Sequence, residues 1–133
     1  VVLMLKSLGI NDLVNFDFLD APPAETLIKS LEQLYALAAL NSRGELTKLG
    51  RRMAEFPCDP MLSKMIISAE KYGVVDEAIT IAAMLDVNNS VFYRPKDRKI
   101  HADTAKMRFA RGGHGDHIAL MRVYVVFDKL YRL

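Results

Sequence analysis

One stretch of the sequence, residues 76–94, constrains the fold more than any other. Its first half is apolar almost all round, because only Thr80 is polar between residues 78 and 85. A helix with so little polar surface is normally buried among other helices. We therefore expect a central helix here, capped by Asp76, in a fold that is mainly α.

The second half of the same stretch changes to polar, aromatic and basic residues. Residues 87–95 combine two amides, a hydroxyl group, two aromatic rings and the Arg94 guanidinium before Pro95. A buried helix that leads into such a loop is typical of a scaffold that presents a binding site. The alternative is that Asn88, Asn89 and Ser90 only cap the helix and turn the chain. For each of these residues taken alone, this alternative remains open.

The net charge of +2 is unevenly distributed along the chain. Seven basic residues lie between residues 94 and 111, and only Asp97 and Asp103 oppose them. Seven minus two gives a local charge of +5, which leaves −3 on the rest of the chain. This asymmetry indicates a polyanionic partner, although charged surfaces are often simply solvated.

Hydrophobic spacing predicts helices along most of the chain. Their expected ranges are 1–8, 20–38, 48–55, 60–72, 95–109 and 116 onward, beside the central helix. Between two of them, Asn41, Ser42 and Gly44 supply turn chemistry, which predicts a β-hairpin over residues 40–47. Helices followed by a small hairpin and another helix are typical of a winged helix.

Two prolines at residues 57 and 60 interrupt the chain and predict a domain boundary. We expect a winged-helix domain over residues 1–56 and a helical bundle over residues 57–133. The chain begins without a methionine and in the middle of a helical pattern, so we expect a fragment whose winged helix is truncated at its N-terminus.

Catalytic and metal-binding patterns are missing from the sequence. The single cysteine, Cys58, excludes an internal disulfide framework. His114 and His117 have no second ligand cluster, so His117 is expected in the first turn of the last helix rather than on a metal. The glycines at 112, 113 and 115 do not form a phosphate-binding loop, since no Gly-Lys-Ser/Thr follows them. We expect no catalytic residue, no cofactor, no membrane partner and no ATP hydrolysis by this chain alone.

Several segments, in order along nearly the whole chain, resemble the helicase-associated region of DEAH-box RNA helicases. They are Leu8–Leu13, Phe16–Pro23, Leu31–Leu37, Leu46–Ala54, Asp59–Lys64, Asn88–Asp97 and Gly115–His117 followed by Tyr124. The chain looks most like the spliceosomal members, among them the ATPase that activates the spliceosome before the first splicing step. Residues 112–115 and 125–133 depart from the family pattern, the latter by lacking a tryptophan after Tyr124.

The resemblance implies a winged helix followed by a helical bundle called the ratchet domain. Two RecA-like domains that bind ATP and magnesium would precede them in the parent chain, and an OB-fold would follow. The ratchet domain would close one side of a channel for single-stranded RNA. A glycine-rich-patch protein would dock on the winged helix, unless its apolar residues Val1, Val2, Leu3 and Phe18 instead pack onto the missing ATPase domain. The parent would be a nuclear hydrolase that works with spliceosome components in mRNA splicing.

The loop after the central helix and the basic helix beyond it are the predicted RNA surface. The predicted RNA-binding residues are Asn88, Asn89, Ser90, Arg94 and Lys96, with Arg111 and His117 as further candidates. The alternative for Arg94 and Lys96 is an ion pair with Asp97 or with a neighbouring domain. The alternative function is a non-enzymatic helical adaptor that binds proteins. Gly-Lys-Thr and Asp-Glu-Ala-His motifs upstream in the parent would decide for the helicase.

Overall fold

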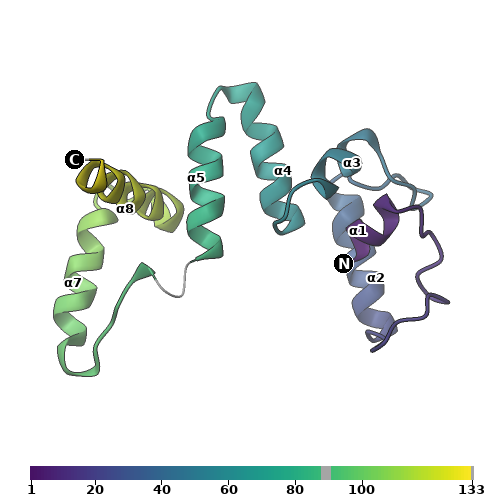
Figure 1. The fold of residues 1–133 in the computed structure, drawn as a ribbon, viewed down its shortest axis with the longest axis horizontal. Coiled ribbons are helices and arrows are strands. Elements are labelled where there is room, and N and C mark those ends of the chain that lie inside the picture. Colours follow the sequence, from purple (N-terminus) through teal and green to yellow (C-terminus); the bar gives the residue numbers. More distant parts are fainter. Residues whose placement is uncertain (88–90, 133) are drawn as a thin grey trace. The chain divides into compact units, whose positions relative to one another are not determined.

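The computed structural model describes residues 1–87 and 91–132, and its ribbon is drawn in Figure 1. The chain divides into two compact units, Val1–Ser68 and Ala69–Leu133. The described residues are mainly helical, which confirms that part of the predicted fold class. The two units meet after residue 68, whereas the sequence predicts a domain boundary after residue 56. The division into domains 1–56 and 57–133 stays a prediction.

Each unit is built from short helices. The first contains α1 (Val2–Ser7), α2 (Ala24–Ala36), α3 (Lys48–Ala54) and all but the last residue of α4 (Pro60–Ala69). The second contains the 3-10 helix η1 (Glu70–Tyr72), α5 (Val75–Asp86), the 3-10 helix η2 (Lys96–Arg98), α7 (Lys99–Phe109) and α8 (Gly115–Tyr131). None of the helices within the described ranges is both long and apolar enough to cross a membrane.

The first unit is held together by one apolar cluster. Its buried members are Leu3, Leu34, Ala39, Leu40 and Met53. Three of them come from α1, α2 and α3, and α1 contacts both of the other helices. Helices of this length are not stable alone in water, so their stability comes from burying this shared cluster.

The β-hairpin predicted over residues 40–47 is wrong. Across residues 1–87 and 91–132 there is no β-strand, and this segment forms only an isolated antiparallel bridge between Leu40 and Leu46. The Asn41 side chain closes the turn instead, because its oxygen accepts N–H bonds from Arg43 and Glu45, both at 2.9 Å. Thr47 is already the N-cap of α3, so the second side of the turn continues into a helix and not into a strand.

The start of α3 lies directly against the backbone of the preceding segment. The Thr47 hydroxyl oxygen accepts the Gly50 N–H at 3.0 Å and donates to the Ala38 carbonyl at 2.7 Å. Gly50 is buried, and a Cβ atom there would lie 2.1 Å from the Ala39 carbonyl oxygen. Glycine is therefore required at position 50 by a close backbone approach.

We predict that Gly50→Ala destabilises the chain by about 1–3 kcal/mol, because the clash with Ala39 outweighs the higher helix propensity of alanine. Urea unfolding followed by circular dichroism measures this change. The matched control is Arg51→Ala on the exposed side of α3, which should change the free energy of unfolding by less than about 0.5 kcal/mol. Equal stability of the two variants would contradict the argument.

The second unit depends on the packing of α8. This helix contacts both α5 and α7 (Figure 1). The buried residues of α5 are Ala78, Ile81 and Ala82, and those of α8 are Ala119 and Leu120. The helix expected to be buried among other helices is buried on one side only, because Ile79 is 47% exposed. Asp76 is not the capping residue either, since α5 begins one residue earlier, at Val75.

Candidate nucleic-acid interface

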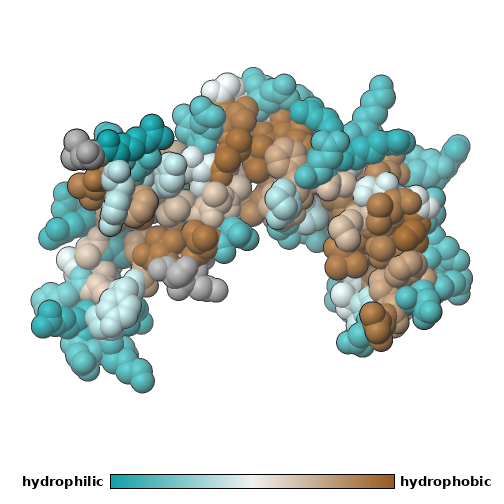
Figure 2. Space-filling model, viewed as in Figure 1, coloured by the Kyte–Doolittle hydropathy of each residue, from teal (hydrophilic) through white to brown (hydrophobic). Residues whose placement is uncertain are grey.

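Aromatic and basic side chains gather where the chain enters α7. A groove of about 560 Å³ lies between residues 91–94 and α7, and we call it the α7 groove. Its α7 side consists of Ala102, Asp103, Ala105, Lys106 and Phe109. Tyr93 is 86% exposed at its edge, and no residue of α7 is buried. Figure 2 accordingly shows a largely hydrophilic surface over α7.

Arg94 forms a two-point ion pair with Asp103 on α7. Its Nε and Nη2 atoms donate to the two carboxylate oxygens at 2.9 and 2.8 Å. Both side chains are accessible, 57% and 44% exposed. The hydrogen bonds from Arg94 lower the pKa of the Asp103 carboxyl, with further help from the charges of Arg94, Lys106 and Lys99. The same bonds raise the pKa of Arg94. Its partner in the structure is thus Asp103 rather than the Asp97 considered from the sequence.

Phe92 and Lys106 connect the α7 groove to a second, smaller cavity. The Lys106 ammonium lies 5.1 Å from the centroid of the Phe92 ring, which is within the range of a cation–π contact. Both residues also line a pocket of about 230 Å³ that contains His117 at the start of α8. The structure therefore places Arg94 and His117 in two adjoining cavities that share Phe92 and Lys106.

The remaining predicted RNA-binding residues are not brought together in one place. Lys96 is exposed in η2, directly after the segment that forms the α7 groove. Arg111 follows the far end of α7, where its carbonyl oxygen accepts a hydrogen bond from the Arg122 guanidinium. Arg122 also donates to the Phe109 carbonyl at 3.3 Å. Asn88, Asn89 and Ser90 lie outside the described residues.

Three residues of this surface were missed from the sequence: Tyr93, Asp103 and Lys106. Tyr93 could have been found, because an aromatic residue beside a basic one is typical of single-strand binding surfaces. Lys106 and Asp103 lie three residues apart, so they share a face of α7. Their relation to Phe92 and Arg94 depends on how the chain folds back onto α7, which no local pattern predicts.

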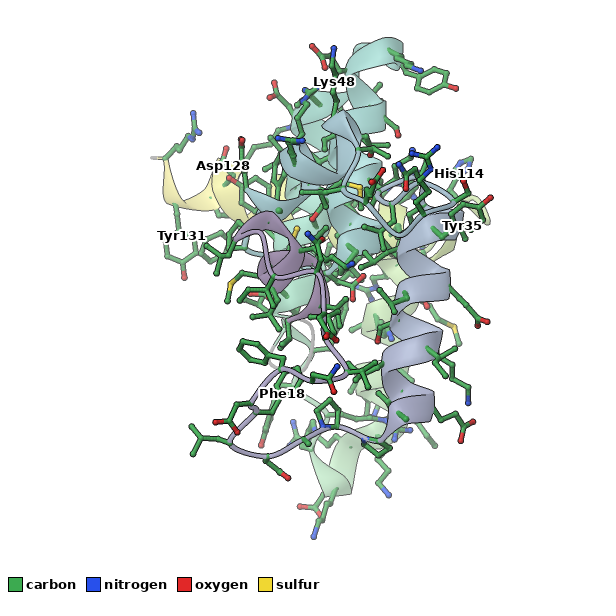
Figure 3. The ribbon with its side chains drawn as sticks, turned by 90° about the vertical axis from the view of Figure 1, so that its right-hand side faces the viewer. Phe18, Tyr35, Lys48, His114, Asp128 and Tyr131 are labelled. Carbon is green, nitrogen blue, oxygen red and sulfur yellow. The ribbon has the colours of Figure 1, made fainter. Side chains whose placement is uncertain are left out.

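An apolar groove of about 460 Å³ lies in the first unit. Its apolar lining includes Val1, Val2, Phe18, Leu27 and Pro60. Phe18 belongs to the segment between α1 and α2, as Figure 3 shows, and its ring meets Phe16 edge to face at 4.7 Å. Figure 2 shows hydrophobic surface over α1 in the same unit. This groove is suited to an apolar partner rather than to a nucleic acid.

Metal-ligating side chains do not form a cluster in the part of the chain that the structure describes. No three His, Cys, Asp or Glu side chains within residues 1–87 and 91–132 lie close enough to hold a metal ion.

Comparison with known families identifies the chain. Residues 30–58 match the family described as helicase associated domain (HA2), winged-helix, and residues 59–120 match helicase associated domain (HA2), ratchet-like. The two matches are adjacent and together cover more than half of the chain. The chain belongs to the helicase-associated (HA2) family, whose domains are accessory modules of DEAH-box helicases. The resemblance seen in the sequence is confirmed at this level.

We predict that the Asp103 pKa lies below its ordinary value of 3.8 and rises in the Arg94→Ala variant. Because the folded-state pKa of Asp103 is lowered, the pair stabilises the fold at pH values above the ordinary pKa of 3.8. This stabilisation is lost as the pH falls through the folded-state pKa. A carbon-detected NMR titration of the Asp103 carboxyl measures both values.

Asp12 provides the control for this titration. Its pKa is lowered by hydrogen bonds from Asn15 in the first unit, which the Arg94 substitution does not touch. Its pKa should therefore stay unchanged. An Asp103 pKa that is the same with and without the Arg94 guanidinium would show that the ion pair does not form in solution.

Proposed function

We propose that this chain is the C-terminal accessory module of an ATP-dependent DEAH-box RNA helicase that acts in pre-mRNA splicing. Its ratchet-like part would form one wall of a channel for single-stranded RNA. The observation that carries this proposal is the α7 groove, where an exposed Tyr93 lies beside Arg94 and Lys106 in a basic segment. The adjacent winged-helix and ratchet-like matches support it.

The groove offers the two kinds of contact that single-stranded RNA requires. An exposed aromatic ring such as Tyr93 stacks on a base without regard to sequence. Arg94 in the groove and Lys96 directly after it supply positive charge for phosphates. The side-chain amides and hydroxyl group of residues 88–90, which lie outside the described residues, are chemically suited to sugar and phosphate oxygens. The opposite wall would come from the RecA-like domains, so the chain alone should bind RNA weakly.

The other parts of this proposal concern the parent protein. Its RecA-like domains would hold ATP and magnesium, and an OB-fold would follow the present chain. The parent would act in the nucleus with spliceosome components. These assignments rest on the sequence resemblance to spliceosomal members of the family.

The winged-helix part is proposed to dock a protein cofactor with a glycine-rich patch. The apolar groove beside Val2 and Phe18 supports this role, because apolar concave surfaces are suited to protein partners. The same groove is also the observation that favours the second candidate function, a helical adaptor that binds only proteins. Gly-Lys-Thr and Asp-Glu-Ala-His motifs upstream in the parent would exclude the adaptor.

Replacing both Arg94 and Lys96 with alanine in the full-length protein should weaken binding of single-stranded RNA. The slope of log affinity against log salt should become shallower by about 0.7 for each phosphate that is no longer neutralised, or by roughly 1.4 for two. Fluorescence anisotropy with a labelled oligonucleotide at several salt concentrations measures both quantities.

The control for this RNA experiment removes the same charge elsewhere. Lys29→Ala with Arg51→Ala changes two exposed cations of the first unit and should leave affinity and slope unchanged. If the Arg94 and Lys96 double variant is folded and binds RNA with the wild-type affinity and slope, the α7 groove does not contact RNA.

Phe18→Asp in the full-length protein should weaken binding of a glycine-rich-patch partner by roughly 10-fold, since it places a charge in the centre of an apolar contact. Isothermal titration calorimetry measures this affinity. Val14→Asp is the matched control, because Val14 is 84% exposed and does not line the groove. Crosslinks to the partner confined to residues beyond Pro60 would contradict the docking proposal.

A further inference from the structure

We propose that Asp103 is a positioning residue of the RNA surface. It holds the Nε/Nη2 edge of the Arg94 guanidinium so that the neighbouring Nη1/Nη2 edge takes an RNA phosphate through two hydrogen bonds. This inference rests on the proposed function. It names the residue that fixes the orientation of the Arg94 guanidinium for its contact with RNA.

The geometry of the ion pair leaves half of the guanidinium available. Asp103 engages Arg94 through Nε and one N–H of Nη2. A guanidinium carries five N–H donors in a fixed plane, so three remain: two on Nη1 and one on Nη2. One N–H of Nη1 and the second N–H of Nη2 point in the same direction and form a two-donor edge next to the one that binds Asp103. The Arg94 side chain is 57% exposed, so a ligand can reach it.

The surroundings of the pair favour an anion on that free edge. Asp103 lies on α7 between Lys99 and Lys106, and the charges of both lysines act on its carboxylate. The charges of three cations, Arg94, Lys106 and Lys99, thus act on the Asp103 carboxylate. A phosphate is the ligand whose shape matches a planar two-point donor and whose charge matches the remaining positive field.

Pre-orientation is what Asp103 adds to this site. An arginine at the edge of an exposed groove samples many rotamers when nothing holds it, and a ligand must then order it on binding. The pair with Asp103 fixes the plane of the guanidinium beforehand. Asp103 should therefore strengthen phosphate binding although it carries the same sign of charge as the ligand.

The sign of the effect separates this role from simple electrostatics. Removing a carboxylate from a basic surface raises its positive charge, and charge alone predicts tighter RNA binding. Loss of a positioning residue predicts weaker binding. Asp103→Asn is the test variant, because an amide has nearly the same shape but can accept through only one of its two terminal atoms.

The experiment measures affinity for a single-stranded oligonucleotide with variants of the full-length protein. Asp103→Asn should bind roughly 3- to 10-fold more weakly than wild type. The same substitution should have no further weakening effect in an Arg94→Ala or Arg94→Lys background, since neither side chain makes the two-point pair. Asp103→Glu, which keeps the carboxylate, should bind RNA more tightly than Asp103→Asn.

Asp97→Asn is the matched control. Asp97 lies in η2 of the same basic segment, and its substitution removes the same charge without touching the Arg94–Asp103 bonds. It should leave RNA affinity unchanged or slightly higher. Melting curves check that each variant is folded. We expect all of them to fold, because the substituted side chains are exposed.

Each outcome decides the question. If Arg94→Ala weakens RNA binding while Asp103→Asn leaves it unchanged or tightens it, Asp103 is not a positioning residue and the proposed function stands. If Arg94→Ala itself leaves RNA affinity at the wild-type value, the Arg94 contact is overturned and the role of Asp103 with it. Weakening by Asp103→Asn that depends on Arg94 supports the inference.

Discussion

The second unit depends on α8, because α7 has no buried residue of its own. A helix in that position is held by its neighbours: α8 contacts it, Arg94 pairs with Asp103 near its middle, and Arg122 binds the carbonyls at its end. The buried residues of α8, Ala119 and Leu120, belong to the same unit as the buried face of α5. The candidate site is therefore built on α7, a helix with little burial that its neighbours hold in place. Elements that bind ligands are commonly of this kind.

The mainly α fold could be predicted because its signals are local. A threonine such as Thr47 before a helical pattern predicts a cap, and its hydroxyl oxygen does accept the Gly50 N–H. A glycine such as Gly73 predicts a helix end, and it adopts a left-handed conformation with φ of 67° directly after η1. The hairpin could not be excluded in this way, because turn residues such as Asn41 serve a hairpin and a side-chain-closed loop equally well. The structure has the side-chain-closed loop, in which the Asn41 oxygen accepts N–H bonds from Arg43 and Glu45.

The candidate site was only partly predictable for a related reason. Arg94 could be identified from its place in a basic segment, but its partner lies nine residues away on a helix that folds back against it. Proximity in the sequence favours Asp97, but Asp97 lies in η2, whereas the partner in the structure lies on α7. Tyr93 is adjacent to Arg94 in the sequence, and only its 86% exposure distinguishes it from the partly buried Phe92.

The Arg122 side chain has a consequence for the electrostatics of α7. An α-helix carries partial negative charge at its C-terminal end, where the last carbonyl groups have no N–H partner. Arg122 places a guanidinium on two carbonyl groups at this end, those of Phe109 and Arg111. The Arg122 charge therefore opposes the negative partial charge at this end of the helix. It reduces the repulsion that the C-terminal end of α7 would otherwise exert on any anion near it.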